Sequence, residues 1–185
     1  MILTEGRIRE AAREAKSQRL DESQLITKFS VTEQYDLFIS HSYSDRDIII
    51  GLNHLFKIAG YKVYIDWIDD KGLNRNNVTP ATAQRIKNRI KASKGMAYIS
   101  TANSTLSKWC PWELGVSDGM NGKVCILPVM DTSFKGQEYL GLYPYLDYAA
   151  SRQGPYEFWV NDQNDSNRYI QLREWLQGKP LKRHN

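Results

Sequence analysis

Glu113 and Trp109 are the residues whose types and spacing point most directly to chemistry. They stand four positions apart, so a helix would place the indole ring and the carboxylate on one face. Pro111 is tolerated only in the first turn of a helix, which predicts that Glu113 lies near a helix start. The positive end of a helix keeps such a carboxylate ionised. We therefore expect Glu113 to face a pocket that fits a sugar, which offers hydroxyls and a flat ring.

Taken alone, the same pattern favours a structural interpretation. A glutamate near a helix start can merely favour the helix dipole, and tryptophans are often core residues. Each further candidate also has a structural alternative, such as a backbone-bonded His41, an Asp66 that caps a turn, or a Trp67 that covers the sheet edge. Their coincidence near the ends of predicted strands favours a site. No other His or Cys stands at ligand spacing from His41, so we expect no metal.

The segments that must position these residues alternate between strands and helices. Buried strands are predicted over residues 35–39, 62–65, 96–99 and 124–129, with a fifth near 145–149. Helices are predicted between them, one beginning at Thr79-Pro80 and one running from about Trp109 to Gly122. Strand–helix–strand units with short loops are right-handed and give a parallel sheet. Ligands bind at the carboxyl edge of such a sheet, where the loops after the strands meet.

Additional elements are predicted at both ends of the chain. Residues 5–18 predict an amphipathic helix that lies against the domain, with a partner-binding arm as the alternative. Residues 157–160 predict a short added strand, and Ser166 is expected to cap a helix carrying Tyr169, Leu172 and Leu176. His54 is expected to point outward or sideways from its helix. These elements are treated as accessories to a three-layer α/β sandwich.

Composition limits the classes of protein to consider. The chain has 185 residues, 41% hydrophobic and 25% charged, which suits one globular domain. The net charge of +4 is too diffuse to indicate nucleic acid. Charges interrupt the first fifteen residues, no apolar run is long enough for a membrane, and the two cysteines suggest no disulfide framework. We therefore expect a cytoplasmic protein.

Three stretches in this order resemble the TIR (Toll/interleukin-1 receptor) domain family, in the form of small stand-alone bacterial proteins. They are Tyr35–Ser42, Val63–Trp67 and Ser107–Leu114, and the match spans about residues 34–150. The resemblance implies a flavodoxin-like fold with a five-stranded parallel sheet. We accordingly predict an N-terminal helical extension over 1–33, a TIR domain over 34–150, and a C-terminal extension with a helix over 151–185. The loop after the second strand departs from the family, because Asn74, Arg75 and Asn76 replace small and glycine-rich residues.

The resemblance also implies an activity, cleavage of the nicotinamide–ribose bond of NAD⁺ as substrate, with no cofactor. Glu113 is then the catalytic residue, and the expected substrate-binding residues are Ser40, His41, Tyr43, Asp66, Trp67 and Trp109. The product would be ADP-ribose or a cyclic signal, in anti-phage defence of the Thoeris-like type. Expected partners are further TIR domains and a downstream effector that senses the product.

Two other classes of protein are weighed against this interpretation. A non-enzymatic TIR scaffold would act through TIR–TIR contacts, and the presence of Glu113 and Trp109 argues against it. A response-regulator receiver would need paired acids after the first strand, where Ser40-His41 stand instead. A flavin carrier would need a phosphate-binding loop there, of which only Ser42 and Ser44 give a hint.

Overall fold

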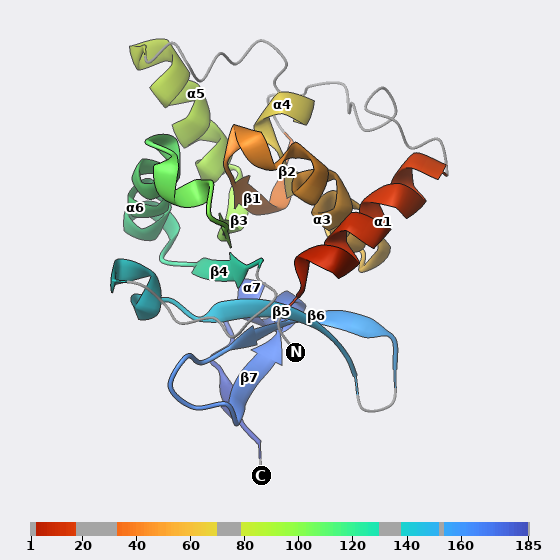
Figure 1. The fold of residues 1–185 in the computed structure, drawn as a ribbon. Helices are drawn as coiled ribbons and strands as arrows, with labels where there is room; N and C mark the ends of the chain where they lie inside the picture. The colour runs from red at the N-terminus through yellow and green to blue at the C-terminus, as the bar shows by residue number, and fades with distance from the viewer. Residues whose placement is uncertain (1–2, 18–32, 70–78, 130–137, 152–153, 185) are drawn as a thin grey trace.

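Runs of aliphatic, β-branched and aromatic residues form a parallel sheet at the centre of the molecule. The computed structural model describes residues 3–17, 33–69, 79–129, 138–151 and 154–184 (Figure 1). The parallel strands lie in the order β2-β1-β3-β4-β5. Their bounds are β1 Tyr35–Ser40, β2 Val63–Tyr64, β3 Ser93–Ser100, β4 Val124–Pro128 and β5 Tyr145–Ala150. The prediction of five parallel strands is confirmed.

The helices between these strands begin and end where the sequence places capping residues. They are α3 Arg46–Ile58, α4 Asp66–Asp69, α5 Pro80–Lys91 and α6 Trp109–Asn121, with short 3-10 turns η1 Tyr43–Asp45, η2 Ser104–Leu106 and η3 Glu138–Leu142. Thr79 caps α5 by accepting a hydrogen bond from the Thr82 amide at 3.1 Å. Gly122 ends α6 at a φ of 61°, a left-handed conformation that glycine adopts without a steric penalty.

Two apolar cores lie on opposite faces of the sheet and give the molecule three layers (Figure 1). On one face, Ile86 and Ile90 of α5 and Leu114 of α6 pack with strand residues such as Phe38. On the other face, α3 and the N-terminal helix α1 (Glu5–Ser17) pack with Leu37, Ile39 and further strand residues. The predicted three-layer α/β sandwich is therefore confirmed.

The carboxyl-terminal segment extends the sheet instead of adding only a helix. Strands β6 Tyr156–Asn161, β7 Arg168–Gln171 and β8 Lys182–Arg183 continue from β5 in antiparallel order, so the sheet has eight strands in the described residues. The added strand predicted near 157–160 is confirmed as β6. The prediction that Ser166 caps a helix through Tyr169 is wrong, because residues 168–171 pair with β6 as a strand. Within the described residues of this C-terminal segment, only α7, Leu172–Leu176, is helical.

The N-terminal helix lies along α3 and changes the surroundings of that helix. Its buried side chains are Ile8, Ala11, Ala12 and Ala15, as the amphipathic pattern predicts. His54 of α3 is 6% exposed, so the expectation that it points outward or sideways is wrong. Glu14 of α1 stands 4.0 Å from its ring. Within the described residues no helix is long and apolar enough to cross a membrane. The division at residues 33/34 and 150/151 stays a prediction.

Candidate active site

Strand β1 delivers two neighbouring polar residues to opposite sides of the sheet edge. Successive side chains of a strand point to opposite faces. Phe38 packs in the α5/α6 core, whereas Leu37 and Ile39 pack in the α1/α3 core. Continuing this alternation, Ser40 reaches α6 and His41 reaches the α3 side. The end of one strand therefore supplies both halves of the candidate site.

Glu113 is held beside β1 by the first of these residues. The Ser40 hydroxyl donates a hydrogen bond to Glu113 Oε2 at 2.6 Å, and both residues are 0% exposed. This distance is typical of a hydroxyl that donates to a carboxylate. Burial raises the pKa of the neighbouring Tyr98 to about 12, and the charge of Glu113 adds to that rise. A neutral phenol thus adjoins the carboxylate.

The positive end of helix α6 stabilises a negative charge on Glu113 less than the position of Glu113 in the sequence suggests. Glu113 is the fifth residue of α6, whose first turn holds no acidic residue. The dipole effect falls off within the first turn of a helix, so the expectation that it keeps this carboxylate ionised is not supported. What the structure places beside the carboxylate is the Ser40 hydroxyl, as a hydrogen-bond donor. Trp109, one turn earlier, meets Trp112 edge to face with ring centroids 5.3 Å apart.

His41 is fixed through both of its ring nitrogens. Nδ1 lies 3.0 Å from the carbonyl oxygen of Ile39, and because that oxygen can only accept, Nδ1 carries the proton. The Trp67 indole N–H donates to Nε2 at 3.1 Å, so Nε2 accepts. The contacts to Ile39 and Trp67 therefore favour the Nδ1–H tautomer of His41. Asp66 Oδ1 lies 3.4 Å from the same Nε2.

A pocket of about 240 Å³ opens at this edge of the sheet. Its lining residues are His41, Ser42, Tyr43, Ser44, Asn103, Leu106, Ser107 and Trp109. Three of the predicted site residues, His41, Tyr43 and Trp109, therefore share one cavity. Ser40 and Glu113 are not among the described lining residues. The expectation that Glu113 faces the pocket is not met in this conformation, because its carboxylate is buried.

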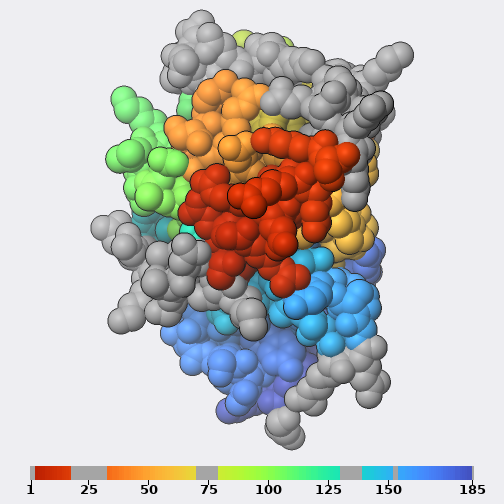
Figure 2. Space-filling model, turned by 45° about the vertical axis from the view of Figure 1, so that its right-hand side comes forward, coloured from red at the N-terminus to blue at the C-terminus, as the bar shows by residue number. Residues whose placement is uncertain are grey.

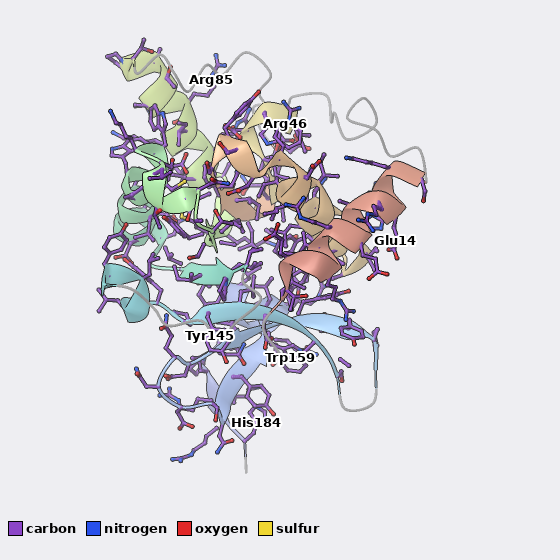
Figure 3. The ribbon with its side chains drawn as sticks, in the orientation of Figure 1. Glu14, Arg46, Arg85, Tyr145, Trp159 and His184 are labelled. Carbon is purple, nitrogen blue, oxygen red and sulfur yellow. The ribbon has the colours of Figure 1, made fainter. Side chains whose placement is uncertain are left out.

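Some residues at this edge are absent from the predicted site. Leu106 is 83% exposed at the pocket although it is aliphatic, and Arg46 lies over the rings of Trp67 and Tyr43 at 4.5 and 5.6 Å. Figure 3 labels Arg46, at the start of α3 beside α4. The sequence signal for both is position, since each follows the end of a parallel strand by about six residues. Residues 70–78, which include Asn74, Arg75 and Asn76, lie outside the described residues.

The described residues include no group of three or more His, Cys, Asp or Glu side chains placed to hold a metal ion. Cys110 and Cys125 are both buried, and burial raises the pKa of the Cys125 thiol. Neither sulfur lines the pocket. What the site offers chemically is a buried carboxylate, a hydroxyl donor, an imidazole and aromatic walls.

These features define a flavodoxin-like α/β domain with a carboxylate at the carboxyl edge of its sheet. A family model described as the TIR domain matches residues 37–174, and the chain belongs to this family. The matched range continues through β6 and β7, beyond the predicted boundary at residue 150.

Two bacterial proteins and one solved structure are similar to the chain. A Bacillus cereus (strain MSX-D12) protein named "Probable 3' cyclic ADP-D-ribose synthase ThsB'" is 42% identical over 77% of this chain and 76% of its own length. A Cytobacillus dafuensis protein named "Putative cyclic ADP-D-ribose synthase TIR2" is 38% identical over 45% of this chain and 22% of its own length. The TIR domain of the Toll-related receptor TRR-2 from Hydra magnipapillata aligns with a TM-score of 0.48 and 19% identity, over 62% of this chain and 84% of that one.

Proposed function

We propose that this chain cleaves the nicotinamide–ribose bond of NAD⁺ and converts the remainder into a cyclic ADP-ribose. The Bacillus cereus relative, whose name states a synthase of that product, supports the proposal through 42% identity over most of both chains. The structural observation that carries it is the buried Ser40–Glu113 hydrogen bond. That bond lies one helical turn from Trp109 and one residue from His41, both of which line the pocket.

Glu113 is proposed to stabilise the positive charge that develops on the ribose. When the glycosidic bond breaks, its electron pair moves to the pyridinium nitrogen, so nicotinamide leaves as a neutral molecule. The ribose carbon is left with oxocarbenium character, as in other glycosyl transfers. A fixed carboxylate in a site shielded from water offsets such a charge more strongly than it would in solution. Glu113 is 0% exposed, which supplies that shielding.

Substrate entry must rearrange the neighbourhood of Glu113. The carboxylate is buried and already accepts a hydrogen bond from Ser40, so a ribose hydroxyl has to replace or join that donor. Trp109 is proposed to wall the ribose, and Tyr43 or Trp67 to stack on a ring of the substrate. His41 and Asp66 would line the remainder. In this step a substrate hydroxyl joins Ser40 at the carboxylate or takes its place.

The acceptor decides between the two products. In cyclisation an atom of the same molecule attacks the ribose carbon, and if it is a hydroxyl oxygen it loses its proton as the new bond forms. In hydrolysis water takes that place, and the product is ADP-ribose. The names of both relatives favour the cyclic product.

The biological setting follows as part of the same proposal. A cyclic nucleotide made in the cytoplasm would act as a signal, here in defence of a bacterium against phage, and a downstream effector would sense it. Membership of the TIR family supports activation through self-association of TIR domains. Turnover should then rise more steeply than protein concentration. The alternative, a TIR scaffold without enzymatic activity, predicts no turnover at any concentration.

The test compares Glu113→Gln with the unaltered protein. Glutamine keeps the shape and can still accept from Ser40, but it removes the charge, so we expect NAD⁺ cleavage to fall at least about 100-fold. Concentrated protein is incubated with NAD⁺, nicotinamide is followed by chromatography, and the second product is identified by mass. The cyclic product is lighter than ADP-ribose by one water molecule.

Glu157→Gln on β6 is the matched control, since it makes the same chemical change on a half-buried strand residue outside the pocket lining. It should retain full turnover. Near-normal turnover by Glu113→Gln would refute the role of the carboxylate. No nicotinamide from the unaltered protein across the concentration series would favour the scaffold.

A further inference from the structure

Helix α1 approaches α3 more closely than ordinary side-chain packing allows. A Cβ atom added to Gly51 of α3 would lie 2.1 Å from the carbonyl oxygen of Ile8 and 2.8 Å from Ile8 Cγ2. The first of these atoms is main chain, so it can give way only if the helix itself shifts. Figure 2 shows α1 in red, flanked by the orange and gold segment that includes α3. The glycine therefore sets how closely α1 can dock.

The docked helix extends its contacts beyond α3 to the candidate site. Ala12 and Ala15 of α1 form a small apolar cluster with Ile50 of α3, and the half-buried Trp67 packs against this cluster. Trp67 belongs to α4, which directly follows β2 at the carboxyl edge of the sheet. On its ring lies the guanidinium of Arg46, 4.5 Å from the centroid. The indole is thus held between α1 and the start of α3.

One hydrogen bond links Trp67 to His41, a residue that lines the pocket. Its indole N–H donates to His41 Nε2 at 3.1 Å, and His41 lines the pocket. An indole N–H can only donate, so while this bond exists Nε2 is the acceptor and its orientation toward Trp67 is fixed.

We propose that Trp67 is a positioning residue for His41 and that helix α1 is the element that holds Trp67 in place. The N-terminal helix is then part of the machinery that shapes the substrate pocket, although it contributes no residue to the lining. The proposal rests on the proposed function for the identity of the substrate. Its structural part concerns the orientation and tautomer of His41 and can be measured without turnover.

The first variant is Trp67→Phe, which keeps an aromatic ring against Ala12 and Ala15 but removes the N–H. We expect the imidazole nitrogen signals of His41 in ¹⁵N–¹H NMR spectra to lose the pattern of a single Nδ1–H tautomer. The KM for NAD⁺ should rise about 3- to 10-fold, the worth of one neutral hydrogen bond, while kcat changes less. A purely structural loss would instead lower kcat by reducing the active fraction.

The second variant is Gly51→Ala, which displaces α1 from the side of α3. Alanine favours a helix more than glycine does, so α3 itself should stay folded. We expect the His41 signals to change in the same direction as in Trp67→Phe, with a similar rise in KM. Because both act through one bond, the double variant should be no worse than Trp67→Phe alone. Ala15→Glu, which disturbs the same contact from α1, serves if Gly51→Ala does not fold.

Glu10→Ala is the control, since this residue lies on the exposed side of α1, and it should leave both readouts unchanged. Unchanged His41 signals in Gly51→Ala and Ala15→Glu, with α1 displaced as judged by hydrogen exchange, would overturn the proposal. Multiplying effects on KM in the double variant would overturn it as well. The proposed function fails separately, if the unaltered protein releases no nicotinamide across the concentration series, and that outcome leaves the NMR result intact.

Discussion

The two faces of the sheet hold their halves of the site in different ways. On the α6 face, Glu113 is buried and bonded to the adjacent strand through Ser40. On the α3 face, His41 accepts a hydrogen bond from Trp67, which packs against Ala12 and Ala15 of the N-terminal helix α1. The carboxylate is therefore held directly by the sheet, whereas the imidazole is linked through Trp67 to a helix that lies outside the sheet.

We interpret this difference as a division between a face that holds the catalytic group and a face whose contacts could regulate the pocket. Opening the α6 face disturbs the buried Ser40–Glu113 pair, whereas shifting α1 alters the pocket from outside. Elements of low local stability are the ones through which proteins are regulated. We therefore expect variants on the α6 face to change kcat, and variants on the α3 face to change KM or stability.

The largest expected effect tests how far the α3-face core extends. Phe158 of β6 is 0% exposed and stacks on Phe56 of α3, with centroids 4.1 Å apart and planes at 12°. We expect Phe158→Ala to lower the free energy of unfolding by about 3–5 kcal/mol, because it opens a cavity between the helix and an added strand. Denaturant unfolding measures this loss.

The neighbouring Glu157→Ala is the control, with an expected change within about 0.5 kcal/mol. A small effect of Phe158→Ala would mean that residues 151–185 are an extension that adds little to stability, in keeping with the predicted boundary at residue 150. A large one makes β6 part of the domain, so that the boundary predicted at residue 150 falls inside one folding unit. The α3 face would then hold the larger core of the two.

The parallel part of the fold could be predicted because its signals are local. Thr79-Pro80 and Gly122 mark helix ends through backbone chemistry that does not depend on distant residues. The strand at 168–171 could not be read in the same way. Tyr169 and Leu172 stand three apart and also fit a helix, and it is the pairing with the neighbouring strands, such as Ile170 with Val160 of β6, that makes the segment a strand.

The candidate site was predictable as a set of residues but not as an arrangement. Because parallel strands end at one edge, Ser40, His41, Trp67 and Glu113 were expected to converge, and the structure brings them together by hydrogen bonds or adjacency. Their roles in binding and catalysis stay predictions. The burial of Glu113 and of His54 could not be seen in the sequence, since each depends on a side chain or a helix supplied from elsewhere.

A smaller effect is expected when the α6 face loses the hydrogen bond from Ser40 of β1 to Glu113. Ser40→Ala removes the hydroxyl that donates to Glu113, and hydrogen bonds to charged groups contribute about 1.5–3 kcal/mol. If the bond is also used in the transition state, kcat should fall between about 10- and 150-fold with little change in KM. If the substrate hydroxyl simply takes the place of Ser40, kcat should be preserved. Steady-state kinetics distinguishes the two, and Ser40→Thr, which keeps a hydroxyl, is the matched rescue.

The smallest effect concerns the surface ion pair that also joins α1 to α3. Lys16 Nζ lies 3.2 Å from Asp47 Oδ1, and both side chains are more than half exposed, at 58% and 60%. Exposed pairs of this kind contribute about 0–1 kcal/mol and weaken with salt. We therefore expect Lys16→Ala to leave the KM for NAD⁺ and the His41 signals nearly unchanged. If Lys16→Ala instead had the same effect as Gly51→Ala in either readout, the ion pair rather than close helix packing would hold α1 against α3. The contacts on the α3 face would then depend on ionic strength.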